Sequence, residues 1–192
     1  MAHVVIMMGS KSDEEKVAPC AGILKRLGIS YVFTVSSAHR TPERTERIVR
    51  EEEAKGAEVF ICAAGMAAHL AGAVAARTIK PVIGIPVSGG VMGGLDALLS
   101  TVQMPPGFPV GTVALDKAGA RNAAWMAAQI LALRDPDLAS RIHAARGAMR
   151  DDVEKAKKEL TEIISSITGE MKTIFAREFQ TINEAFGQTF LE

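Results

Sequence analysis

The stretch E-V-F-I-C-A-A at residues 58–64 decides the fold. Its apolar residues run almost without a break, which is typical of a strand buried on both faces of a parallel sheet. Four more runs of this kind are V-V-I-M-M at 4–8, Y-V-F-T-V at 31–35, P-V-I-G-I-P-V at 81–87 and V-G-T-V-A-L at 110–115. The sequence therefore predicts five short strands that are buried in one sheet.

Helical patterns of crossover length separate these runs. The second of them begins with Thr41 at the N-cap and Pro42 at the first helical position, as helix starts commonly do. The expected helices span 14–27, 42–55, 67–77, 95–102 and 118–133. Strands that alternate with helices predict an α/β fold, a three-layer sandwich around a five-stranded parallel sheet of the flavodoxin-like kind. Ligands bind such sheets at the carboxyl ends of the strands.

The chain from residue 134 onward has a different character. It is charged and helical, and apolar residues recur at spacings of four and three at Leu160, Ile164, Ile167, Met171 and Ile174. The stripe continues on a shifted face with Phe175, Phe179, Phe186 and Phe190. We expect a catalytic α/β domain at 1–133 and a helical extension at 134–192. The extension either folds back on its own domain or, as we favour, is an oligomerisation arm laid across a neighbouring subunit.

Composition excludes several classes of protein. The 22 basic and 22 acidic residues cancel, and aromatic residues make up only 5%, so nothing indicates a nucleic-acid partner. No segment approaches the roughly 20 apolar residues of a membrane span, and the N-terminus lacks the pattern of a signal peptide. Cys20 and Cys62 match no metal or redox motif and are expected to be small buried side chains. These features favour a cytoplasmic protein without a metal.

Polar residues crowd the loop after the first predicted strand, in M-G-S-K-S-D at 8–13. Backbone N–H groups at a helix start, beside the hydroxyls of Ser10 and Ser12, suit a phosphate group. Asp13 can accept hydrogen bonds from sugar hydroxyls. The alternative is that Ser12 or Asp13 simply caps the helix.

The loop after the second strand, V-S-S-A-H-R-T-P-E at 35–43, is denser still. Arg40 at a helix start is electrostatically unfavourable unless an anion such as phosphate binds there. Imidazoles titrate near neutral pH, so His39 suits proton transfer. A surface histidine and a solvated arginine are the alternative, but Ser36 and Ser37 beside them favour a functional site.

The loop after the third strand is A-A-G-M-A-A-H-L-A-G at 63–72. Gly65 and Gly72 allow the backbone to approach a ligand closely. His69 is either a functional group or a buried histidine that is satisfied by a carbonyl group. The fingerprint G-x-G-x-x-G does not occur in this loop, which disfavours a dinucleotide site. All these loops fall on one edge of the predicted sheet.

With these motifs, the chain resembles the PurE family, the N5-carboxyaminoimidazole ribonucleotide mutases of purine biosynthesis. The resemblance rests on M-G-S-K-S-D, S-A-H-R-T-P, A-A-H-L-A-G and the G-G-L-D to A-Q-I-L stretch, and covers roughly residues 4–133. It implies a nucleotide substrate bound by Ser10, Asp13 and Arg40, catalysis by His39, a second active-site loop that holds His69, and no cofactor. Ser12, Ser37 and Gly65 complete the expected substrate-binding set.

The resemblance also implies a homo-octamer and a reaction in which a carboxylate moves from N5 to C4 of an aminoimidazole ribonucleotide, with CO2 as a transient intermediate. Where the mutase branch commonly has a glycine and a proline in the third loop, this chain has Met66 and Ala71. Three alternatives stay open: a carboxylase that adds CO2 directly to aminoimidazole ribonucleotide, a non-catalytic flavodoxin-like nucleotide-binding module, and a structural assembly protein that uses the C-terminal helix.

Overall fold

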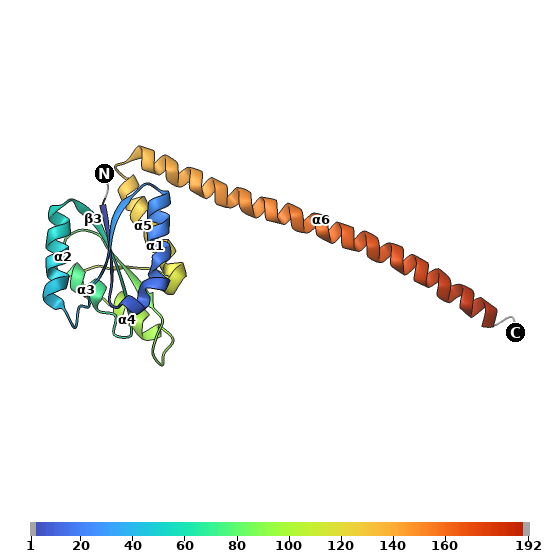
Figure 1. Ribbon diagram of the computed structural model, residues 1–192, viewed down its shortest axis with the longest axis horizontal. Helices are drawn as coiled ribbons and strands as arrows, with labels where there is room; N and C mark the ends of the chain where they lie inside the picture. Colours follow the sequence, from blue (N-terminus) through green and yellow to red (C-terminus); the bar gives the residue numbers. More distant parts are fainter. Residues whose placement is uncertain (1–2, 190–192) are drawn as a thin grey trace. The chain divides into compact units, whose positions relative to one another are not determined.

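The computed structural model describes residues 3–189, and the compact unit up to Ile142 is a three-layer α/β sandwich (Figure 1). Its single sheet is parallel and has the order β2-β1-β3-β4-β5. The strands are β1 His3–Met8, β2 Ser30–Val35, β3 Ala57–Gly65, β4 Val82–Val87 and β5 Gly111–Thr112. This is the flavodoxin-like order, in which the direction of winding reverses between β1 and β3. The predicted fold class is confirmed.

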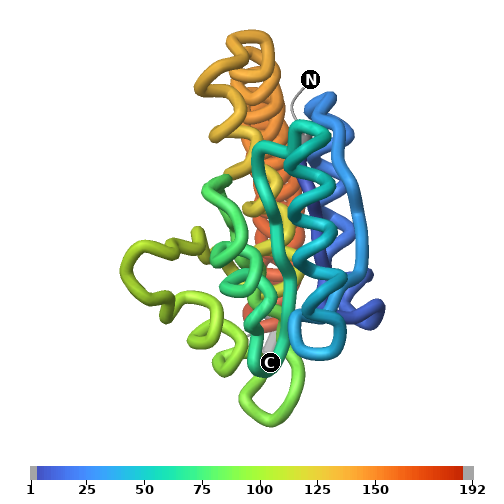
Figure 2. Tube along the Cα trace, turned by 90° about the vertical axis from the view of Figure 1, so that its left-hand side faces the viewer, coloured from blue at the N-terminus to red at the C-terminus, as the bar shows by residue number. Residues whose placement is uncertain are grey.

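Helices cover both faces of the sheet. Helices α1 Glu14–Arg26 and α5 Asp116–Ala132 pack together on one face, while α2 Pro42–Ala54 and α3 Leu70–Ala75 lie on the other (Figure 1). Figure 2 views the sheet from the side of α2 and α3, which lie in front of it. Helix α4 Leu95–Val102 packs against β4, and a short 3-10 turn, η1 Lys11–Asp13, leads into α1.

The central strands are buried because helices lie above and below them. Val4, Val5, Ile6 and Met7 of β1 have no exposed surface, and every residue of β4 is buried. On β3, Phe60 is also fully buried. Burial on both faces explains why these strands read as continuous apolar runs.

Two elements are shorter than the sequence predicted. Strand β5 contains only Gly111–Thr112, because the chain turns away to start α5 at Asp116, after one further bond from the Val113 N–H to the Gly84 carbonyl. Helix α3 begins at Leu70 and not at 67, because Met66 has a left-handed backbone with φ 55° and a tight turn follows it. In that turn the His69 N–H donates to the Ala67 carbonyl at 2.9 Å.

The last helix, α6 Pro136–Thr189, starts within the first unit and continues as the second unit from His143. Leu138 and Ile142 are buried in the first unit, and Arg141 Nε donates to the Leu27 carbonyl at 3.0 Å. All side chains from 151 to 187 are exposed. Phe190 lies outside the described residues, and the expected boundary between 133 and 134 stays a prediction. Among the described helices, none has the length and apolar character needed to cross a membrane.

Candidate active site at the carboxyl ends of the strands

A cavity of about 720 Å³ opens where β1, β2, β3 and β4 end. It lies beside the point where the strand order reverses, which is where sheets of this kind bind ligands. The eight residues of the expected catalytic and substrate-binding set all line it: Ser10, Ser12, Asp13, Ser37, His39, Arg40, Gly65 and His69. The structure thus brings three separate loops together, while the role of each residue stays a prediction.

The serines of the first loop form a small hydrogen-bonded group. Ser10 caps the 3-10 turn by accepting from the Ser12 N–H at 3.3 Å, and the Ser12 hydroxyl donates to Ser10 Oγ at 2.8 Å. Asp13 occupies the N-cap position of α1 and lines the cavity, but it makes no capping bond, and its Oδ1 lies 3.3 Å from Ser12 Oγ. Burial raises the pKa of Asp13, against the lowering effects of the Ser12 hydroxyl and the Lys16 ammonium. The alternative that Ser12 or Asp13 only caps the helix is not supported, since neither side chain makes a capping bond to α1 and the Ser10 side chain caps the 3-10 turn before it.

Contacts to the first two loops hold Arg40 in place. Its Nε lies 3.4 Å from Ser37 Oγ, and its terminal nitrogen lies 3.4 Å from the Gly9 carbonyl. Thr41 stands at the N-cap of α2 as predicted, yet its hydroxyl makes no capping bond and donates to the Ser37 carbonyl at 3.0 Å. Ser36 is buried against Thr45, with 2.8 Å between the two hydroxyls. Of the two serines, Ser37 is the one that lines the cavity.

The two histidines meet across the cavity, although thirty positions separate them in the chain. His39 Nε2 and His69 Nδ1 are 2.7 Å apart, and the rings form a T-shaped pair at an interplanar angle of 78°. His69 is exposed and its ring partner is His39, so the alternative of a buried histidine bonded to a carbonyl group is wrong. Such a contact needs one N–H and one lone pair, so the two rings hold a proton between them. The arrangement can pass a proton from one ring to the other.

Backbone geometry of the third loop explains two of its residues. A Cβ on Gly65 would come within 2.9 Å of the Val87 carbonyl oxygen, so glycine is required there by the packing of β3 against β4. Met66 adopts the left-handed conformation that glycine tolerates best, at the position where the sequence departs from a family glycine. Ala64, Leu70 and Val87 add an apolar wall to the cavity.

Three residues outside the predicted set, Lys16, Ser88 and Asp116, form a polar network, and Lys16 and Ser88 line the cavity. Lys16 Nζ donates to the Ser88 carbonyl at 2.6 Å and to its hydroxyl at 2.7 Å, and lies 3.3 Å from Asp116 Oδ1. Asp116 accepts from the Ser88 N–H at 2.8 Å and from the Ser88 hydroxyl. Burial tends to raise the pKa of Asp116, but the Ser88 bonds and Lys16 outweigh it and hold that pKa below its usual value. Ser88 follows β4 directly, and a polar residue at the end of a buried strand is the sequence pattern that could have identified it as part of the site.

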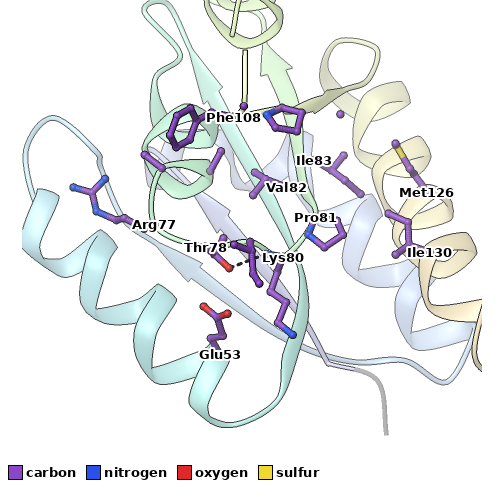
Figure 3. Close-up of a pocket in the computed structure, with 16 residues that line it drawn as sticks. Glu53, Arg77, Thr78, Lys80, Pro81, Val82, Ile83, Phe108, Met126 and Ile130 are labelled. Carbon is purple, nitrogen blue, oxygen red and sulfur yellow. Dashed lines mark hydrogen bonds between the residues drawn. The ribbon is translucent and has the colours of Figure 1, made fainter. Parts of the chain in front are cut away.

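A second cavity, of about 840 Å³, lies near the amino ends of β4 and β5 (Figure 3). Pro81, Val82, Phe108, Met126 and Ile130 give it a mostly apolar lining. Arg77 is turned toward one side and Lys80 toward another, so their charges do not converge on one point (Figure 3). The amino ends of parallel strands are also the wrong edge for ligand binding. The smaller cavity is the better candidate for an active site.

The fold and the cavity define this chain as a flavodoxin-like α/β protein with a polar, histidine-containing site at the switch point of its sheet. The sequence model of a family described as AIR carboxylase matches residues 3–152. The chain belongs to this AIR carboxylase family. Within the described residues no cluster of three or more histidine, cysteine or acidic side chains is arranged to hold a metal ion.

Relatives of known name are similar over most of their length. The N5-carboxyaminoimidazole ribonucleotide mutase of Escherichia coli strain K12 is 47% identical over 152 residues, which cover 79% of this chain and 90% of that protein. The protein of the same name from Pseudomonas aeruginosa is 50% identical over 135 residues, which cover 70% and 83%. The crystal structure of Treponema denticola PurE matches with a TM-score of 0.76 at 28% identity, covering 83% of this chain and 99% of that one.

Proposed function

We propose that this chain is an N5-carboxyaminoimidazole ribonucleotide mutase, which moves a carboxylate from N5 to ring carbon C4 in purine biosynthesis. The observation that carries the proposal is the 2.7 Å contact between His39 and His69 in a cavity that Ser10, Asp13 and Arg40 also line. The names and identities of the relatives support it.

In this proposal the polar loops bind the nucleotide away from the reacting atoms. Arg40 and the hydroxyls of Ser10, Ser12 and Ser37 take the phosphate, because a guanidinium and hydroxyl donors suit phosphate oxygens. Asp13 accepts hydrogen bonds from the ribose hydroxyls. Fixing the phosphate and the ribose holds the aminoimidazole ring beside the histidines, and such positioning lowers the barrier by reducing the entropy lost in the reaction.

The reaction then needs two proton movements that balance. The bond from N5 to the carboxylate breaks, CO2 is released, and N5 takes a proton from His39. Carbon C4 attacks the CO2, the new carbon–carbon bond forms, and the proton on C4 returns to His39. His69 holds the His39 ring through the Nδ1 contact and can share its proton. The apolar wall at Ala64, Leu70 and Val87 keeps CO2 beside the ring in a site poor in water.

The proposal extends to assembly and location. We infer a homo-octamer, as the family resemblance implies, and large apolar side chains that are exposed on the first unit support contacts between subunits. Among them are Ile79 at 98%, Val91 at 102% and Phe108 at 46% exposure. A cytoplasmic location agrees with Cys20 and Cys62, which are buried and unpaired. Light scattering of the purified full chain measures the subunit number.

The decisive experiment supplies N5-carboxyaminoimidazole ribonucleotide to the purified full chain and follows the product by ultraviolet absorbance. Turnover is expected without bicarbonate. The sister activity, direct carboxylation, is favoured by the description of the family and predicts turnover of aminoimidazole ribonucleotide only when bicarbonate is added. Binding of either nucleotide without turnover would instead indicate a non-catalytic module.

Variants separate the roles of the two adjacent residues. His39→Asn should reduce turnover by at least about 100-fold and leave substrate affinity nearly unchanged, since general acid–base catalysis contributes that much. His143→Asn, a histidine on α6 outside the cavity, is the control. Arg40→Ala should weaken binding by about 10- to 100-fold, as loss of a charge-assisted bond does, whereas Arg47→Ala should not. Near-normal turnover by His39→Asn would remove His39 from the mechanism.

A further inference from the structure

We propose that helix α6 from Arg146 onward pairs in parallel and in register with the same helix of a second copy of this chain. The match to the family ends at residue 152, so most of this segment lies outside the part that the family chemistry requires. Described by itself, it is a single unbroken helix (Figure 1). The pairing is independent of the reaction at the cavity.

The apolar side chains of this segment repeat every eleven residues. Two columns of residues carry the repeat, and each member of the first lies four positions before a member of the second. The columns are Met149, Leu160, Met171 and Ile182, followed by Val153, Ile164, Phe175 and Phe186. Eleven residues complete about three turns of an α-helix, so the columns run nearly straight along one side.

The stripe formed by these columns is exposed along its whole length. Together with Ile163, Ile167, Ile174 and Phe179, its side chains are between 43% and 71% exposed. The stripe extends over about 50 Å, since an α-helix rises 1.5 Å per residue. Phe175 and Phe179 stack on each other within the helix, with 6.0 Å between ring centroids. Single exposed apolar residues are usually scattered over a surface, whereas these residues form one continuous stripe. A continuous apolar surface of this length is typical of a docking face.

The charges on the two flanks of the stripe indicate which partner covers it. By helical geometry, one flank carries Arg146, Arg150, Lys157 and Lys172, with Glu154 as its acidic exception. The other flank carries Asp152, Glu159, Glu170 and Glu178, with Lys155 and Arg177 as its basic exceptions. A second copy in parallel sets the basic flank of one helix against the acidic flank of the other. An antiparallel copy would set like charges together.

Three pairs of opposite charges stand two positions apart in the chain: Arg150 and Asp152, Lys157 and Glu159, and Glu170 and Lys172. Residues two apart on a helix do not face each other, so these pairs cannot close within one chain. Lys157 does approach Glu154 at 3.8 Å, and Lys155 approaches Glu159 at 4.0 Å, but both pairs are exposed and long. In a parallel pair, each of the three lies at nearly the same height across the interface.

A membrane surface fits this helix less well than a second copy does. Helices that lie on membranes are rich in Lys and Arg on the polar face. Here most basic and acidic residues beside the stripe are sorted to opposite flanks. The side away from the stripe carries three acidic residues, Asp151, Glu162 and Glu184, and one basic residue, Lys158. The sorted charges match another helix of the same sequence.

Cysteine cross-linking of the full chain tests the pairing. Leu160→Cys and Ile182→Cys should each form a disulfide-linked dimer on mild oxidation, because equal positions of the stripe meet in a parallel pair. Ser166→Cys, on the opposite side of the helix, is the control and should remain monomeric on a denaturing gel. The native thiols give little background: both are buried, and burial raises the pKa of Cys20 to about 12 and the pKa of Cys62 as well.

Other outcomes overturn the proposal. Failure of both stripe variants to cross-link, while the proteins remain folded by circular dichroism, excludes the parallel pair. A disulfide between Leu160→Cys and Phe175→Cys proteins in a mixture, without dimers of either alone, indicates an antiparallel pair. Sedimentation with anionic phospholipid vesicles that is lost in Phe175→Asp, together with no cross-linking, indicates a membrane surface.

A charge-reversal experiment tests the pairing of the flanks. Lys172→Glu should reduce the cross-linking yield of Ile182→Cys, and adding Glu170→Lys should restore it.

Discussion

Two phenylalanines, one in each unit, differ greatly in how far their side chains are buried. Phe60 on β3 has no exposed surface, whereas Phe175 on α6 is 71% exposed. Both belong to regular apolar patterns, one of a buried strand and one of a helix stripe. The pattern identifies which face of an element is apolar, but it does not identify what covers that face. In the first unit the chain buries the apolar faces of its central strands, whereas we propose that a second copy of the chain covers the stripe of the second unit.

The largest expected effect separates these two phenylalanines. Phe60→Ala should lower the unfolding free energy of the first unit by about 3–5 kcal/mol, the usual cost of removing a buried ring. Phe175→Ala should change it by less than about 0.5 kcal/mol, as exposed substitutions do. Urea unfolding followed by the fluorescence of Trp125, the only tryptophan, measures the first unit because this residue lies on α5.

The expected difference would be contradicted if Phe175→Ala lowered the unfolding free energy of the first unit, measured by Trp125 fluorescence, as much as a core substitution does. That result would mean that the helix covers its stripe with its own first unit. Circular dichroism recorded on the same samples follows α6, which contributes much of the helix in the chain.

The second expected difference in stability is between a carboxylate held in a hydrogen-bonded network, Asp116, and an exposed one, Asp151. Asp116→Asn should lower the stability of the first unit by about 1–2 kcal/mol at neutral pH, because it weakens charge-assisted bonds to Ser88 and Lys16. The folded pKa of Asp116 is lowered, so its stabilising effect is present above the ordinary value of 3.8 and is lost as the pH falls through the folded pKa. The wild type and the variant should therefore converge in acid.

The matched control is Asp151→Asn on α6, whose exposed carboxylate lies 3.9 Å from Arg150. This change should leave the urea midpoint unchanged across the same pH range, since exposed pairs contribute little. If Asp116→Asn behaved like Asp151→Asn, the network around Ser88 would have no part in stability.

The smallest effects come from backbone conformation, and the two regions call for opposite substitutions. Met66→Gly should stabilise the first unit by about 0.5 kcal/mol, because the left-handed cost removed exceeds the added entropy of the unfolded chain. Gly169→Ala on α6 should stabilise the helix by up to about 1 kcal/mol, because a Cβ there meets nothing within 4 Å. Trp125 fluorescence and circular dichroism, respectively, measure the two. Ala67→Gly, next to Met66 but without its left-handed backbone, should destabilise.

Much of the fold could be predicted because its strands are buried on both faces. A short, nearly continuous apolar run such as 58–64 is compatible with few structures besides a buried strand, and α4 was predicted with its observed bounds, Leu95–Val102. Element ends were harder to predict. The turn at Met66 shortens α3, and it depends on a backbone conformation that a methionine does not indicate.

The candidate site could be predicted only where it followed the rule that ligands bind at strand ends. That rule alone brings Ser10, Ser37 and Gly65 to one cavity. The bonds from Lys16 to Ser88 join residues 72 positions apart, and those from Ser88 to Asp116 join residues 28 apart. No local pattern encodes such contacts, and the same applies to the meeting of His39 with His69. They depend on how loops pack once the sheet has formed.

The brevity of β5 has a consequence for the behaviour of the protein in concentrated solution. An open sheet ends in two border strands whose free backbone groups can recruit strands of other molecules and seed aggregates. On the β5 side only Gly111 and Thr112 form the border, too short a template for another strand to extend. On the β2 side, Arg44 donates to the Val35 carbonyl at 3.1 Å and so occupies an acceptor at the end of that strand. The sheet is thus closed to growth at one border by its length and restricted at the other by a charged side chain.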